Sequence, residues 1–184
     1  MTVRSSEVAE TRSTARDSIR GHPLVAFVAL TYLLTWSLWL ISFLLGGQES
    51  IAGSVAFVAG GLGPAAAAAI VLKVSGRSLK AWGRSLVKWR VPVPFWLYAL
   101  GLPALILFAA NLTLVMLGEP VEWSLIGERV GPYFMTFLAT LFLLGAMEEP
   151  GWRGFALPRL QQRFSPMKAT MILGVVWGLW HLPL

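Results

Sequence analysis

The feature that most constrains this chain is a run of 23 residues, 23–45, in which no side chain is charged at neutral pH. An α-helix rises 1.5 Å per residue, so about 20 apolar residues are enough to cross the ~30 Å hydrocarbon core of a bilayer. Four further apolar runs follow, at residues 51–72, 93–117, 132–147 and 167–184. The pattern predicts an all-α fold, a polytopic membrane helix bundle with about five spans.

The composition excludes the other common classes of chain. Hydrophobic residues make up 56% of the sequence and charged residues 13%, whereas soluble domains carry roughly 25% charge. Disordered chains are much poorer in apolar residues than this one. The absence of cysteine excludes disulfide scaffolds and thiolate metal sites. The first apolar run is also too long for a signal peptide, whose apolar region spans roughly 7–15 residues.

The chain divides into a polar tail and a membrane domain. Residues 1–22 are rich in Ser, Thr and Arg and are predicted to be a disordered cytoplasmic tail. Residues 23–184 are predicted to form a transmembrane domain. Within it, residues 51–72 carry many Gly and Ala, which let helices approach closely in lipid. We therefore expect this run inside the bundle.

The charges of the loops predict one orientation. Residues 73–90 hold basic residues and no acidic one, as cytoplasmic loops do. Counting spans outward from this loop, residues 46–50 and 118–129 fall outside, and the N-terminus and residues 148–168 fall inside. The basic excess thus sets orientation and contacts anionic lipid, and nucleic acid is not an expected partner. Eleven Arg against four Lys is typical of a GC-rich bacterium, so we expect a multi-pass protein of the bacterial inner (plasma) membrane with a cytoplasmic N-terminus.

Two adjacent acids, Glu148 and Glu149, follow the fourth apolar run. Ionised groups near hydrocarbon are costly and usually mark function or a paired structural site. Arg153 stands four residues after Glu149, which places the two on one face of a helix, while Glu148 points roughly 100° away. If the helix kinks at Pro150 and continues for about ten residues, Glu148 becomes a buried acid free for chemistry. If the helix ends at Pro150, both acids cap the span in water.

His181 is the second anomaly, because it lies deep in the last apolar run. Trp177 precedes it by one helical turn, and Gly174 and Gly178 form a small-residue face on which another helix could approach the imidazole closely. If that helix is the fourth span, Glu148 and His181 could meet and polarise a water molecule for attack on a carbonyl. A hydrogen-bonded packing histidine is the alternative.

Residues 148–160 and 177–184 together resemble the CPBP family of intramembrane proteases, which contains the Rce1-type CAAX prenyl protease 2 enzymes and the bacterial Abi proteins. The first family motif is Glu-Glu-x-x-x-Arg, which matches Glu148, Glu149 and Arg153. The second is an aromatic residue, three other residues and His, which matches Trp177 and His181 with Trp in place of the commoner Phe. The two motifs together are specific, whereas either alone is weak.

The resemblance implies an all-helical membrane fold with a cavity open to the cytoplasm and hydrolysis of peptide bonds in a peptide or membrane-protein substrate. By the same resemblance Glu148 is the general base, His181 its partner, and Glu149 with Arg153 a supporting ion pair. The family pattern continues with His-x-x-x-Asn or Asp on a later helix, whereas this sequence ends three residues after His181. We therefore expect a C-terminally truncated domain that does not catalyse alone.

The sequence identifies neither a bound metal nor the substrate. A catalytic zinc site needs about three protein ligands, and the motif His-Glu-x-x-His is missing. Glu148 and His181 are the candidate ligands for a divalent metal such as zinc, and Glu149 is the other side chain that could serve. No residue indicates recognition of a prenyl group. A noncatalytic partner-binding or bacteriocin-immunity protein is the alternative function, and a proton-coupled transporter would also bury Glu and His.

Overall fold

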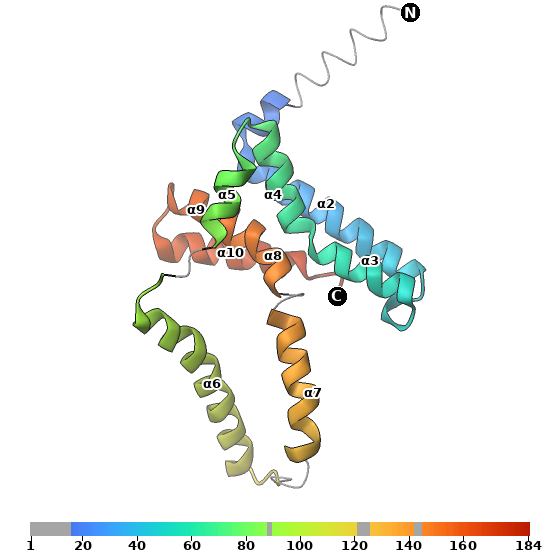
Figure 1. Cartoon of the computed structure of the whole chain (residues 1–184), viewed down its shortest axis with the longest axis vertical. Helices are drawn as coiled ribbons and strands as arrows, with labels where there is room; N and C mark the ends of the chain where they lie inside the picture. Colours follow the sequence, from blue (N-terminus) through green and yellow to red (C-terminus); the bar gives the residue numbers. More distant parts are fainter. Residues whose placement is uncertain (1–15, 88–89, 121–125, 142–144) are drawn as a thin grey trace, which may run out of the picture. The chain divides into compact units, whose positions relative to one another are not determined.

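A computed structural model describes residues 16–87, 90–120, 126–141 and 145–184 (Figure 1). Every regular element in these ranges is helical, so the predicted all-α membrane fold is confirmed. In chain order the elements are α2 (Pro23–Leu44), the 3-10 turn η1 (Gly47–Glu49), α3 (Ile51–Gly61), α4 (Gly63–Val74), α5 (Leu79–Leu86), α6 (Val93–Met116), α7 (Ile126–Ala139), α8 (Gly145–Gly151), the π-helical turn η4 (Trp152–Ala156), α9 (Leu157–Gln161) and α10 (Pro166–Trp180).

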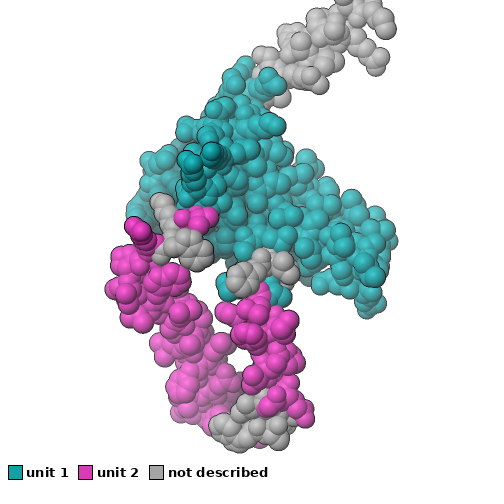
Figure 2. Space-filling view, viewed as in Figure 1, with its two compact units in different colours: residues 1–86, 139–184 teal, residues 87–138 magenta. Residues whose placement is uncertain are grey.

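The chain forms two compact units, residues 1–86 with 139–184 and residues 87–138 (Figure 2). The second unit holds α6, a 24-residue helix without a charged side chain and with no buried residue. Helices that are apolar on every side are typical of membrane spans or of protein cores. The first unit holds both sequence motifs.

Among the described residues, α2 and α6 are long and apolar enough to cross a membrane, and α3 with α4 forms a third candidate that is bent by 48°. The predicted fourth run, 132–147, passes through residues 142–144, which lie outside the described residues. The predicted fifth run contains α10, a helix of 15 residues. The lengths of α2 and α6 therefore agree with the predicted first and third spans.

Most of the predicted tail, residues 1–15, lies outside the described residues. Residues 16–21 are helical, and Arg20 donates a hydrogen bond of 3.1 Å from Nε to the carbonyl of Val74 at the end of α4. The last residues of the tail thus contact the membrane domain.

One face of α2 packs against the small residues of α3 and α4. Its buried side chains recur at helical spacing: Phe27, Thr31, Thr35, Trp39 and Ser42. Pro64 has no N–H, so the Gly60 carbonyl lacks its usual helical donor, and Thr35 Oγ1 donates to that carbonyl at 2.8 Å. A side chain of α2 thus supplies a hydrogen bond to the carbonyl at the kink between α3 and α4. This bond explains how the bent pair fits against a straight helix.

The helical segment that holds the adjacent glutamates does not end at Pro150. Helix α8 continues through η4 into α9, so the chain stays helical as far as Gln161. Pro150 removes one backbone donor inside the helix, and the π-helical turn begins two residues later at Trp152. Proline and π-helical turns are the usual causes of local distortion in a helix, and π-helical turns are frequent at functional sites.

An aromatic cluster fixes η4 and α10 on α2. The Phe27 ring meets Trp152 edge-on at 5.2 Å and Phe155 at 5.0 Å, and Trp180 lies 4.9 Å from Trp39 and 5.8 Å from Trp152. All five side chains are buried. This cluster holds the two motif-bearing segments at a defined distance from each other.

Candidate active site

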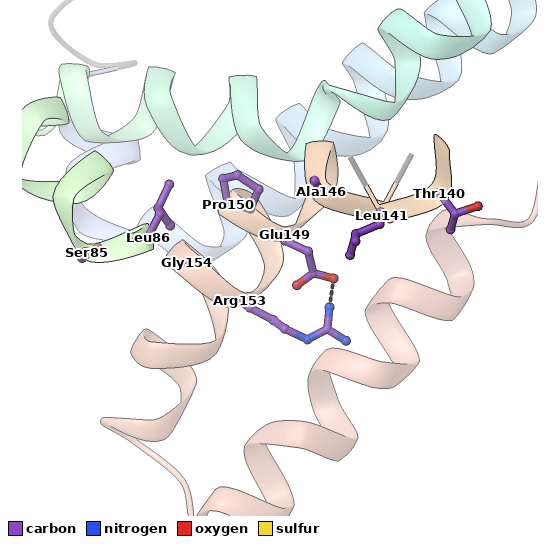
Figure 3. Close-up of a pocket in the computed structure, with 10 residues that line it drawn as sticks. Ser85, Leu86, Thr140, Leu141, Ala146, Glu149, Pro150, Arg153 and Gly154 are labelled. Carbon is purple, nitrogen blue, oxygen red and sulfur yellow. Dashed lines mark hydrogen bonds and ion pairs between the residues drawn. The ribbon is translucent and has the colours of Figure 1, made fainter. Parts of the chain in front are cut away.

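Glu149 and Arg153 form the ion pair that their spacing predicts. Arg153 Nη1 donates to Glu149 Oε1 across one turn of the distorted helix. The pair lines a cavity of about 710 Å³ together with residues of α5 and of the segment before α8, and its side chains point toward each other there (Figure 3). The side chains of Arg153 and Glu149 are 61% and 40% exposed, so the pair is open to its surroundings rather than enclosed.

Glu148 faces a different partner, as the helical register predicts. Trp177 Nε1 of α10 donates a hydrogen bond of 2.9 Å to Glu148 Oε2, across 29 residues of sequence. Glu148 is half-buried, and the two adjacent carboxylates thus have separate partners, Trp177 for one and Arg153 for the other. This division keeps the Glu148 carboxylate apart from the ion pair.

His181 caps the C-terminal end of α10. Its Nδ1 lies 2.9 Å from the carbonyl oxygen of Trp177, one turn earlier. The imidazole also packs edge-on against the rings of Trp177 and Trp180, at 4.5 Å and 4.6 Å between centroids. Trp177 therefore contacts both Glu148 and His181, and the structure brings these two predicted residues to one place.

The surroundings of Glu148 change its proton affinity. Burial raises the pKa of the Glu148 carboxyl above its ordinary value, because a poorly solvated site disfavours the charged form. The Trp177 hydrogen bond and positive charge on His181 lower this pKa, and the negative charge of Glu149 raises it. The net direction is upward, so Glu148 binds a proton more tightly than a free glutamate does.

The glycine face of the last helix does not make this contact. A Cβ added at Gly174 or at Gly178 would meet nothing within 4 Å, and both glycines are exposed among the described residues. Within the described residues of the unit that holds both motifs, no helix approaches His181 across these glycines. The buried face of α10 runs instead through Ala169, Leu173 and Trp180.

A close backbone contact sets the position of α8. Gly151 lies against α4 so closely that a Cβ at this position would overlap the carbonyl group of Pro64. Gly151 is three residues from Glu148 and directly precedes the buried Trp152. The sequence shows this glycine, but only the structure shows the contact that requires it.

Two tryptophans complete the site in ways that spacing alone does not reveal. The aromatic position of the second motif is visible in the sequence, but the bond from Trp177 to Glu148 depends on how α8 and α10 pack. Trp152 is 1% exposed, and its Nε1 has no hydrogen-bond partner among the described residues. No spacing in the sequence indicates that this indole is buried.

A metal centre is not built by the part of the chain that the structure describes. No group of three or more His, Cys, Asp or Glu side chains in this part could hold a metal ion. Glu148 and His181, the candidate ligands from the sequence, are two donors where a catalytic zinc needs about three. The donor set therefore does not fit such a site.

Comparison with known proteins places the resemblance in the same segment. Residues 130–184 match the family described as type II CAAX prenyl endopeptidase Rce1-like. The CAAX prenyl protease 2 of Methanococcus maripaludis is 37% identical over 95 residues, which cover 51% of this chain and 34% of that protein. The chain thus spans about a third of the length of this relative, and no solved structure matches it. The resemblance inferred from the two motifs is confirmed, and with the apolar helices it identifies a membrane protein.

Proposed function

We propose that this chain, which is similar over residues 130–184 to the type II CAAX prenyl endopeptidases, carries the water-activating part of an intramembrane endopeptidase, in which Glu148 and His181 activate a water molecule to hydrolyse peptide bonds. The observation that carries the proposal is the bond from Trp177 to Glu148, which joins α8 to the turn of α10 that bears His181. A carboxylate and an imidazole in one place are the pair that water activation needs.

Glu148 serves as the general base. Its carboxylate takes a proton from water while the water oxygen forms a bond to the carbonyl carbon of the substrate. The proton then passes to the amide nitrogen, the C–N bond breaks, and a carboxylate and an amine are released. Burial supports this role, because the raised pKa of Glu148 makes its carboxylate a stronger base than a free glutamate.

His181 orients the water by accepting a hydrogen bond from it. The carbonyl oxygen of Trp177 can only accept a hydrogen bond, so the hydrogen of a neutral His181 lies on Nδ1 and its Nε2 can accept one. Arg153 partly neutralises Glu149, which limits the repulsion between the adjacent carboxylates. The ion pair thus supports the site without taking part in proton transfer.

The substrate is a peptide segment or a membrane protein that reaches the site from the lipid or from the cytoplasmic side. The name of the Methanococcus maripaludis relative, CAAX prenyl protease 2, suggests prenylated CAAX ends as one substrate class. A peptide library with prenylated and unprenylated ends separates this class from general membrane peptides.

The test is cleavage of that library in liposomes by the full-length protein, with residues 1–184 measured beside it, because the sequence predicts that these residues do not catalyse alone. The Glu148→Gln variant should lose about 100-fold or more of the rate, which is the usual contribution of a general base. The matched control is Glu49→Gln, which makes the same chemical change in η1, away from both motifs. Equal activity of Glu148→Gln and the control would contradict the proposal, and binding of a peptide by both without cleavage would favour a noncatalytic partner-binding protein.

A further inference from the structure

Trp177 contacts both proposed catalytic residues. Its indole Nε1 lies 2.9 Å from Glu148 Oε2, and its carbonyl oxygen lies 2.9 Å from His181 Nδ1. Its ring also packs edge-on against the imidazole. A single residue therefore contacts the acid through its side chain and the histidine through its backbone.

The indole bond distinguishes the two oxygens of Glu148. Indole N–H is a donor only, so Trp177 cannot take a proton from the carboxyl group or give one up during the reaction. With Oε2 engaged by Trp177, Oε1 is the oxygen left to accept a proton from water. A donor on one oxygen also favours the charged carboxylate, which is the form a base requires.

The backbone bond distinguishes the two nitrogens of His181. A carbonyl oxygen accepts and never donates, so Nδ1 of the neutral imidazole carries the hydrogen. The lone pair of the ring then lies on Nε2. The hydrogen bond that one ring nitrogen makes sets the role of the other, and here the Trp177 carbonyl oxygen provides that bond to Nδ1.

We propose that Trp177 is a positioning residue, which holds Oε2 of Glu148 and fixes the Nδ1–H form of His181 so that Oε1 and Nε2 are the two atoms that act on water. The inference rests on the proposed function and adds to it the residue that sets the geometry. A phenylalanine at position 177 would keep the ring contact with His181 and would lose the bond to Glu148.

The first experiment does not require catalysis. A membrane-permeant carbodiimide reacts with protonated carboxyl groups, and its attachment to Glu148 is measured by mass spectrometry of the full chain in liposomes. Trp177→Phe removes the donor that favours the carboxylate, so labelling of Glu148 at neutral pH should rise about tenfold, the effect of one hydrogen bond to a charged group. Glu148→Gln gives the background.

The matched control is Trp36→Phe. Trp36 also donates an indole hydrogen bond of 2.9 Å, but its acceptor is the carbonyl oxygen of Trp180. The control should label like the unchanged chain. Labelling of Trp177→Phe that equals the unchanged chain or the control would overturn the proposal.

A second measurement covers a Trp177→Phe variant that fails to fold. In NMR spectra of the protein with Trp177 in place, the indole ¹⁵N–¹H signal of Trp177 should shift when Glu148→Gln is introduced. The indole signal of Trp36 should not shift. An unmoved Trp177 signal would contradict the bond itself.

Kinetics separate this inference from the proposed function. If the chain cleaves peptides, Trp177→Phe should lower kcat by about tenfold and leave KM nearly unchanged, because the bond orients the base and does not hold the substrate. A change confined to KM would contradict the positioning role. If no peptide is cleaved, the proposed function fails, and the labelling and the indole signal still decide whether Trp177 holds Glu148.

Discussion

Glu148 and Glu149 are neighbours in the chain but have different partners, and this difference predicts how one acts on the other. Glu149→Gln removes a negative charge that raises the pKa of Glu148, and it frees the positive charge of Arg153. The pKa of Glu148 should fall. Any step that needs its carboxylate is lost as pH falls through that pKa, so the acid limb of the rate profile should move to lower pH.

Carbodiimide labelling measures the same change directly. At a given pH, Glu149→Gln should reduce the labelling of Glu148 by up to about tenfold, since one pKa unit corresponds to a factor of ten in the protonated fraction. The control is Glu49→Gln. An increase in labelling would mean that the interaction between the two acids has the opposite sign.

At the residue scale, the sequence predicted the pairing of Glu149 with Arg153 and missed the hydrogen bond between Trp177 and Glu148. The spacing of Glu149 and Arg153 indicated their pairing, and the 100° turn of a helix indicated that Glu148 points elsewhere. The bond from Trp177 to Glu148 was out of reach, because it depends on the distance between two helices and on the conformations of two side chains.

At the scale of elements, the position of α8 on α4 depends on a missing side chain. Gly151→Ala places a Cβ on the carbonyl group of Pro64, which belongs to the backbone and cannot rotate away. The helices must separate, and we expect a loss of roughly 1–3 kcal/mol in the free energy of unfolding, typical of an overpacked core. Thermal unfolding in detergent measures it.

Gly61→Ala is the matched control for this substitution. A Cβ at Gly61, in α3, would meet nothing within 4 Å, so the variant should be as stable as the unchanged chain or slightly more stable, because Ala favours a helix over Gly. Equal stability of the Gly151→Ala and Gly61→Ala variants would contradict the close contact between α8 and α4.

The sequence predicted where the helices are better than how they are interrupted. The uncharged runs predicted the first and last residues of α2 and α6 almost correctly. The kink of the second run at Gly63 and Pro64 and the π-helical turn after Pro150 depend on which backbone groups find donors from another helix, such as Thr35, and a single run of residues does not specify those donors.

At the scale of the whole molecule, the orientation in the membrane remains a prediction from the charges of the loops. The chain has no cysteine, so single cysteines report it cleanly. Ser78→Cys should be protected from an impermeant thiol reagent added to intact cells, and Glu119→Cys should react with it, because positively charged loops stay in the cytoplasm. Labelling of Ser78→Cys alone would reverse the proposed orientation.

The central claim is that Glu148 and His181 act on one water molecule, and a double-mutant cycle tests it most directly. Peptide cleavage by the full-length protein in liposomes is measured for Glu148→Gln, His181→Gln and the double variant, with His22→Gln as the control for the other histidine. Each single variant should lose about 100-fold or more, and the double variant should be no slower than the slower single variant, because residues that act as a unit are not additive. Losses that multiply in the double variant, or full activity in either single variant, would contradict the claim.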